Sequence, residues 1–168
     1  FTGSFHGRTL GTIAASNNAN HLEGFGLPLE GFINIERDNI DKLLGALDES
    51  TAAILIEPIQ GEGGINVFDT DFLKKVETIA RKKDILLILD EVQSGMGRTG
   101  KLFAHELFNI KPDIMSLAKG LGGGFPVGAC LMKDSVANAM NPGTHGSTFG
   151  GNPLAMAVGN CVTDIVSD

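Results

Sequence analysis

The sequence lacks several features that would point to a particular class of protein. It contains no Trp, no Tyr and only two cysteines, Cys130 and Cys161. These two have no CxxC or other metal-ligand spacing, so we expect no metal site and two reduced cysteines in the hydrophobic core. No apolar run approaches the roughly 18 residues of a membrane helix, and there is no signal-peptide pattern. These absences predict a cytoplasmic protein that does not enter a membrane.

Positive charge is also scarce. The chain has 13 Lys and Arg residues against 20 Asp and Glu residues, a formal net charge of −7. An acidic protein is repelled by nucleic acids and by anionic membranes, so we expect neither as a main partner. The 168 residues, of which 42% are hydrophobic, are enough for one domain with its own core.

Glycine, in contrast, is abundant. The sequence has 23 glycines, about twice the usual share of roughly 7%. They cluster at 61–64, 95–100, 120–124 and 146–151. Such clusters are typical of loops whose backbone approaches a ligand closely, although ordinary turns account for a part of them.

Two short apolar runs, Ile85–Leu89 and Ile114–Leu117, each lead to a charged residue. Asp90 follows the first run directly, and Lys119 follows the second after one alanine. Apolar runs of this length, separated by a helical-length segment, are typical of parallel strands in an α/β sheet. The carboxyl ends of parallel strands share one edge of the sheet, where ligands bind. We therefore expect Asp90 and Lys119 to face a common crevice.

Other segments predict the rest of an α/β fold with a mostly parallel sheet and flanking helices. Thr51–Ile56 is a strand candidate, and Asp71–Lys83 has the spacing of an amphipathic helix, so residues 51–89 predict a β-α-β unit. We expect a loop over 17–34 and another over 60–64. The remaining predicted elements are helices over Leu10–Ser16, Ile40–Leu47 (capped by Asp38 or Asn39), Asp134–Met140 (capped by Asp134) and Leu154–Val166, and a strand over Val127–Met132.

An acid and an amine in one crevice suit pyridoxal 5'-phosphate (PLP). This cofactor needs a lysine amine for covalent attachment and an anion against its pyridine nitrogen. By spacing alone, a solvated Asp90 and a solvated Lys119 are the more common outcome, because perturbed acid–base sites are a minority of such placements. The pair is therefore a hypothesis that needs support from other motifs.

Four motifs give that support. They are SFHGRT at 4–9, EPIQGEGG at 57–64, LDEVQSGMGRTGKLFAHE with SLAKGLGGGFPVGA at 89–129, and HGSTFGGNPLA at 145–155. In this order they resemble the fold-type I, class III aminotransferases, most of all the acetylornithine-specific group, over nearly the whole chain. The resemblance implies that residues 1–168 form the central part of the PLP-binding large domain, without its N-terminal segment and the C-terminal small domain.

The resemblance also implies roles in cofactor binding. Lys119 would attach the cofactor and then move the substrate proton as general base and acid. Asp90 would stabilise the protonated pyridine, Phe5 would stack on its face, and Gln93 would contact the ring hydroxyl oxygen. Thr148 would donate its hydroxyl to the phosphate held by the partner subunit, so that a homodimer shares its active sites.

Three further residues are implied to bind substrate. Arg8 would clamp a carboxylate, Glu62 would pair with an arginine supplied from outside the chain, and Ser147 would complete the set. Without the resemblance, Arg8 is better interpreted as a surface ion-pair residue and Glu62 as an exposed loop acid. We expect His6 to be structural, and Glu91 has no clear role.

The implied function is PLP-dependent transfer of an ω-amino group from acetylornithine or a related amino acid to 2-oxoglutarate, in arginine biosynthesis. Ornithine, succinyl-diaminopimelate and 4-aminobutyrate are alternative donors within the same family. A nucleotide-binding α/β module is an alternative of another class, because Gly95–Lys101 matches GxGxxG and most of GxxxxGK. Leu102 stands where that second motif needs Ser or Thr for Mg²⁺. A third alternative is a catalytically inactive fragment of a longer protein that is itself an active enzyme.

Overall fold

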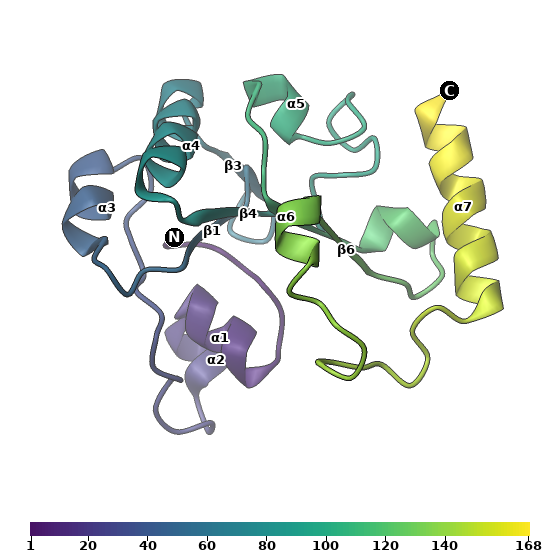
Figure 1. Ribbon diagram of the computed structural model, residues 1–168, viewed down its shortest axis with the longest axis horizontal. Coiled ribbons are helices and arrows are strands. Elements are labelled where there is room, and N and C mark those ends of the chain that lie inside the picture. The colour runs from purple at the N-terminus through teal and green to yellow at the C-terminus, as the bar shows by residue number, and fades with distance from the viewer.

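The main sheet has four strands in the order β1-β4-β5-β6, within a computed structural model that describes residues 1–168. β1 (Ala53–Ile56), β4 (Leu86–Asp90) and β5 (Ile114–Leu117) are parallel, and β6 (Ala129–Met132) is antiparallel to β5 (Figure 1). The predicted α/β fold with a mostly parallel sheet is confirmed. The hydrophobic runs before Asp90 and Lys119 are neighbouring central strands.

Helix α4 (Thr70–Lys83) makes the crossover between β1 and β4, which confirms the predicted β-α-β unit. Asp69 caps the start of the helix, and its carboxylate accepts a hydrogen bond from the backbone N–H of Phe72. It ends at Asp84, which has left-handed backbone dihedrals. Three basic residues in its last turn lie at the negative end of the helix dipole and stabilise it.

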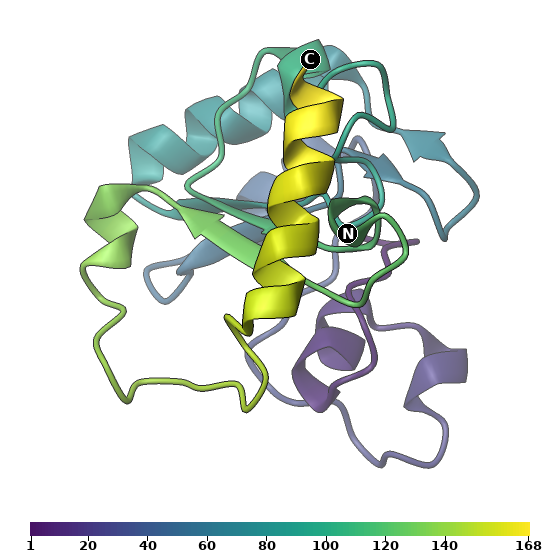
Figure 2. The same ribbon diagram turned by 90° about the vertical axis from the view of Figure 1, so that its right-hand side faces the viewer.

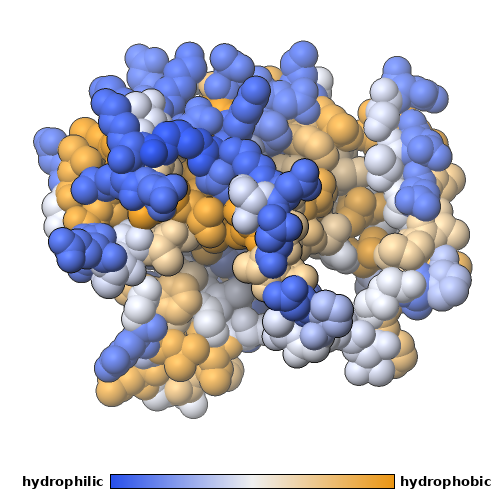
Figure 3. All heavy atoms as spheres, viewed as in Figure 1, coloured by the Kyte–Doolittle hydropathy of each residue, from blue (hydrophilic) through white to orange (hydrophobic).

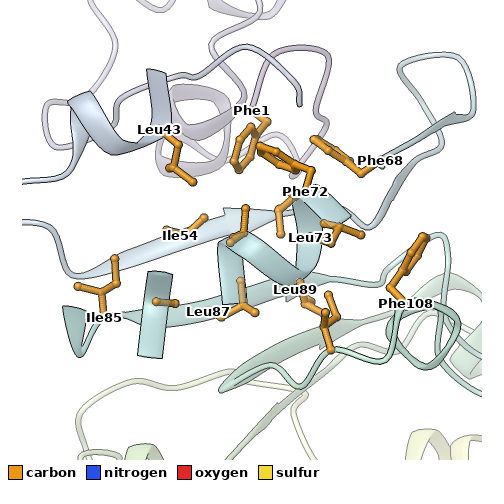
Figure 4. Packing of buried hydrophobic residues seen from close by; sticks show 14 residues of the cluster. Phe1, Leu43, Ile54, Phe68, Phe72, Leu73, Ile85, Leu87, Leu89 and Phe108 are labelled. Carbon is orange, nitrogen blue, oxygen red and sulfur yellow. The ribbon is translucent and has the colours of Figure 1, made fainter. Parts of the chain in front are cut away.

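The main core lies between α4 and the strands β1 and β4 (Figure 4). Three phenylalanine rings gather at one side of it: Phe1 and Phe68 have centroids 5.5 Å apart, and Phe68 stacks on Phe72 at 5.7 Å. Burial of each large apolar side chain contributes about 1.5–3 kcal/mol to the stability of the fold. This cluster therefore stabilises the β1-α4-β4 unit and with it the edge of the sheet. Its strand and helix members include Ile54, Ile56, Leu87, Leu89, Leu73, Val76 and Ala80.

The remaining elements surround the sheet, as two perpendicular views show (Figures 1 and 2). None of the helices combines the length and the hydrophobicity that crossing a bilayer requires. These elements are α1 (Leu10–Ser16), α2 (Ala19–Leu22), α3 (Ile40–Ala46), β2 (Ile59–Gln60), β3 (Asn66–Val67), α5 (His105–Phe108), the 3₁₀ helix η1 (Lys119–Gly122), α6 (Asp134–Ala137) and α7 (Pro153–Ser167).

Two segments predicted as loops contain regular structure. The 17–34 segment includes α2, which forms because the Asn18 side chain accepts a hydrogen bond from the N–H of Asn20 at the helix start. Gln60 ends β2, and residues 61–64 lie in the turn of the hairpin in which β2 pairs with β3. Both elements are too short to give a recognisable hydrophobic period.

Two other local predictions are wrong. Asp134 does not cap α6, because Lys133 occupies the cap position and makes no side-chain bond there. Cys130 and Cys161 are exposed rather than in the core. Cys130 lies on β6, an edge strand with an open face, and Cys161 lies on α7, which packs on η1 along one side.

Asp113, directly before β5, fastens the end of the sheet opposite to Lys119. Its carboxylate accepts hydrogen bonds from the N–H of Leu87 at 2.8 Å, from Nζ of Lys133 at 2.8 Å and from the guanidinium of Arg81. Burial raises the pKa of this carboxyl, but the three donors outweigh burial, and the net pKa is lowered. One side chain therefore ties β4, α4 and the end of β6 together.

We expect Asp113→Asn to lower the free energy of unfolding by about 1–3 kcal/mol at pH 7. The estimate is modest because the Arg81 and Lys133 side chains are 38% and 45% exposed and water screens them. The lowered pKa means that the stabilisation is complete above the unfolded pKa of about 3.9 and is lost as the pH falls through the folded pKa.

Urea unfolding between pH 7 and pH 2 tests this expectation. The gap between wild type and Asp113→Asn should narrow in acid, and a gap that stays constant would contradict the assignment. Asp164→Asn, at an exposed position of α7, is the control and should stay within about 0.5 kcal/mol of wild type.

Candidate active site

Asp90 ends β4 as a buried carboxylate with a hydrogen bond on each oxygen. Its Oδ2 lies 2.8 Å from Nδ1 of His6, and its Oδ1 accepts the N–H of Val92 at 3.0 Å. An ionised carboxylate can only accept, so Nδ1 of His6 carries the hydrogen in this bond. The sequence did not predict this contact, since we expected His6 to be merely structural.

Lys119 lies at the carboxyl end of the neighbouring strand β5 and opens η1. Its φ of +45° is left-handed, which is uncommon for a residue with a long side chain. The side chain is exposed, and its Nζ donates to Oε1 of Gln93 at 3.4 Å. Because β4 and β5 are parallel, with Asp90 in register with Ser116, the acid and the amine lie at the same edge of the sheet, as predicted.

The hairpin between β2 and β3 lies against this edge of the sheet at Gly61. A Cβ atom at Gly61 would lie 2.3 Å from Cδ of Gln93, so only glycine leaves the Gln93 amide where it is. A Cβ atom at Gly63 would lie 2.2 Å from the backbone oxygen of Gly3. The hairpin, the turn after β4 and the N-terminal segment therefore meet closely, with Glu62 exposed between the two glycines.

Glu57, which directly follows β1, holds the N-terminal segment over the sheet edge. Its buried carboxylate accepts the backbone N–H of Phe5 at 2.7 Å. Burial raises the pKa of Glu57, the negative charge of Asp90 raises it further, and the Phe5 N–H opposes both effects. The residue is thus a buried acid that positions the backbone next to His6.

Phe5 and Arg8 lie against each other. The guanidinium carbon of Arg8 lies 5.4 Å from the centroid of the Phe5 ring, and the ring of His21 meets Phe5 edge-on at 5.6 Å. Arg8 is exposed and makes no ion pair, so the surface ion pair that we considered for it does not form. Its charge is available to a ligand at the cost of one cation–π contact, about 0.5–1 kcal/mol at an exposed site.

Glu91, to which the sequence assigned no role, fixes the glycine-rich segment after β4. It is 1% exposed, and its carboxylate accepts the N–H groups of Ala104 and His105 at 2.6 and 2.8 Å. These bonds start α5, which has no side-chain cap of its own. Burial raises the pKa of Glu91, and the two N–H groups oppose that effect.

The same segment argues against the nucleotide-binding alternative. In a dinucleotide site the GxGxxG glycines follow a strand directly and open a helix, so that the phosphates meet the helix N-terminus. Here Glu91–Ser94 separate β4 from Gly95, and residues 95–101 form turns rather than a helix start. The next helix, α5, begins only at His105.

Two of the predicted residues are not brought to Asp90 and Lys119. Ser147 and Thr148 lie in the exposed loop between α6 and α7, and none of their hydrogen bonds reaches the sheet edge. A mostly hydrophobic cavity of about 570 Å³ lies between α1, α3 and β1. His6 borders it, but Asp90 and Lys119 do not, so it is not the site described above.

Substituting alanine for the two closely packed glycines of the hairpin, Gly61 and Gly63, should have different effects on stability. In Gly61→Ala the new methyl group meets the end of the flexible Gln93 side chain, which can turn away. We expect less than about 1 kcal/mol loss of unfolding free energy but loss of the Lys119–Gln93 contact. In Gly63→Ala the methyl group meets a backbone oxygen, and we expect a loss of about 1–3 kcal/mol.

Urea denaturation measures both costs. Gly45→Ala, in α3 and with open space around it, is the control and should be neutral or stabilising by up to about 1 kcal/mol. Equal destabilisation by Gly61→Ala and Gly63→Ala would show that the described packing of the hairpin is wrong.

Comparison with known proteins gives consistent matches along the whole chain. Acetylornithine aminotransferases of Mesorhizobium japonicum and Aquifex aeolicus are 58% and 52% identical over 166 residues, which are 99% of this chain and 42% and 44% of those proteins. The chain thus spans about two fifths of the length of these relatives.

Solved structures agree with this result. Ornithine aminotransferase from Toxoplasma gondii superposes with a TM-score of 0.94 at 41% identity, covering 99% of this chain and 40% of that one. Acetylornithine aminotransferase from Elizabethkingia anophelis gives 0.79 at 45% identity, covering 83% and 38%. The family model of the class-III aminotransferases matches residues 1–168, and the chain belongs to this family.

Proposed function

We propose that these residues form the central part of the cofactor-binding domain of a PLP-dependent aminotransferase. The enzyme would move the ω-amino group of acetylornithine or a related amino acid to 2-oxoglutarate, in arginine biosynthesis. The observation that carries the proposal is the pairing of a buried carboxylate, Asp90, with an exposed amine, Lys119, at one edge of a parallel sheet in a chain of this family.

The residues present fit PLP. His6 and Val92 each donate one hydrogen bond to Asp90, and the carboxylate keeps acceptor positions for the N–H of a protonated pyridine. Lys119 has an exposed amine whose one hydrogen bond, to Gln93, is long and easily exchanged. When bound, PLP would supply an electron sink for the C–H bond that breaks at the substrate carbon bearing the transferred amino group.

The side chains around that site have separable tasks in this proposal. Lys119 would attach the cofactor through Nζ and, once released, would take the proton from the substrate carbon that bears the ω-amino group and deliver it to the cofactor. Asp90 keeps the proton on the pyridine nitrogen. Gln93 binds the ring oxygen and steadies the lysine amine, and Phe5 stacks on the ring and keeps its plane fixed.

Substrate recognition is assigned to exposed groups at the rim. We propose that Arg8 leaves the face of Phe5 to bind a substrate carboxylate bidentately. Glu62 and Ser147 complete the substrate site. Thr148 binds the phosphate of the cofactor that the partner subunit holds. The location of Thr148 in an open loop supports a role across a homodimer rather than within one subunit.

The surface supports the dimer as well. Phe149, Leu154 and Ile165, in and before α7, are 79%, 61% and 69% exposed, which is costly unless a partner covers them. Hydrophobic residues are visible among hydrophilic ones over this part of the molecule (Figure 3). Free thiols at Cys130 and Cys161 fit the reducing cytoplasm that we propose as its location.

The choice of amino donor rests on the relatives. Those at 52–58% identity are named acetylornithine aminotransferases, which favours acetylornithine as the donor. The high TM-score with an ornithine aminotransferase supports ornithine as the second candidate.

We expect Lys119→Ala to abolish the visible absorption band that appears when the protein is incubated with PLP. Aminotransferase activity should fall by at least about 10²–10⁴-fold, because the proton on the carbon that bears the transferred amino group loses its acceptor. Lys101→Ala, at an exposed lysine of the neighbouring glycine-rich loop, is the control and should keep the band.

A wild-type band that persists in Lys119→Ala would refute the lysine assignment. Tight binding of ATP or NAD without any PLP uptake would instead favour the nucleotide-binding alternative.

A further inference from the structure

His6 is a buried histidine whose ring has a single polar partner. The side chain is 3% exposed, and Nδ1 lies 2.8 Å from Oδ2 of Asp90. The other ring nitrogen, Nε2, is buried and has no hydrogen-bond partner. A buried polar atom without a partner is destabilising, so packing alone does not explain why an imidazole occupies this position.

The backbone on both sides of the ring is fastened. The N–H of His6 donates to Oγ of the buried Ser16 at 3.0 Å, and the N–H of Phe5 donates to Oε1 of Glu57 at 2.7 Å. These two bonds join the N-terminal segment to α1 and to the end of β1. These anchors fix the backbone position from which the ring reaches Asp90.

Asp90 is in turn a carboxylate with a limited choice of orientations. Val92 holds Oδ1 from the turn after β4, and His6 holds Oδ2 from the opposite segment of the chain. Two donors on different oxygens fix the rotation of the carboxylate plane, whereas one donor would leave it free to turn.

We propose that His6 is a positioning residue that holds the Asp90 carboxylate, through its Nδ1–H group, in the orientation that faces the pyridine nitrogen of the cofactor. The inference rests on the proposed function, since it requires a ring nitrogen opposite Asp90. His6 acts through Asp90 and not on the reacting atoms.

The test compares two ligands that differ in one atom. PLP has a ring nitrogen for Asp90, and its 1-deaza analogue has carbon there, so an effect that passes through Asp90 reaches only PLP. For His6→Ala we expect PLP binding to weaken by about tenfold. Binding of the deaza analogue should change by less than about twofold, since it loses no partner of the carboxylate.

Two conservative variants sharpen the comparison. The amide nitrogen of His6→Asn can stand near the position of Nδ1, so this variant should keep most of the PLP affinity. The longer His6→Gln reaches towards the position of Nε2 and should behave like His6→Ala. If His6→Ala does not fold, His6→Asn and His6→Gln are compared instead. The measure is again the ratio of the affinity for PLP to the affinity for the deaza analogue.

Ser16→Ala is the matched control, because it removes an anchor of the same segment and keeps the imidazole. Any loss in this variant should be equal for PLP and for the deaza analogue. Equal losses for the two ligands in His6→Ala would overturn the inference and leave the proposed function intact. A wild-type protein that gives no visible band with PLP would overturn the proposed function instead.

A measurement without any cofactor gives an independent result. The ¹⁵N NMR spectrum of the His6 imidazole should show a hydrogen on Nδ1 in the bond to Asp90. A tautomer protonated at Nε2 alone would refute the inferred bond.

Discussion

A carboxylate at the end of a buried strand has to be hydrogen bonded, and the arrangement around Asp90 follows from that requirement. The turn after β4 supplies one donor, from Val92. The second donor, on His6, lies 84 residues earlier in the chain, so the N-terminal segment must lie across the sheet edge. Glu57 holds the same segment through Phe5. Satisfying one buried acid thus brings β1, β4 and the first residues of the chain together.

The amine side of the same edge is built differently. Lys119 is exposed, has left-handed backbone dihedrals and touches only the amide of Gln93 among polar side chains. Gln93 in turn keeps its place because Gly61 has no side chain. A firmly held acid beside a loosely held amine suits a site in which the bound ring stays still while the lysine moves. Asp90 is held firmly because it is buried, and Lys119 is held loosely because it is exposed. The difference requires no flexibility of the sheet itself.

The sequence predicted the parts of the fold that hydrophobic periodicity governs. The strands before Asp90 and Lys119, the helix α4 between β1 and β4, and the shared edge of the parallel strands were all inferred correctly. The position of Lys119 at this edge was predictable because a charged residue after an apolar run is a local signal, whereas its role was implied only by the resemblance to the family.

Contacts between distant residues were not predictable in the same way. The bond from His6 to Asp90 has no local pattern, although the position of His6 inside the SFHGRT motif could have directed attention to it. The capping of α5 by Glu91 acts on N–H groups 13 and 14 residues further along. The exposure of Cys130 depends on what covers an edge strand, which composition does not reveal.

Chemical trapping of the bound cofactor tests the central claim most directly. Borohydride reduction of the protein with PLP, followed by proteolysis and mass spectrometry, identifies the lysine that carries the pyridoxyl group. The account predicts modification of Lys119 and its loss in protein that was denatured before PLP was added. Modification of a different lysine in the folded protein would contradict it.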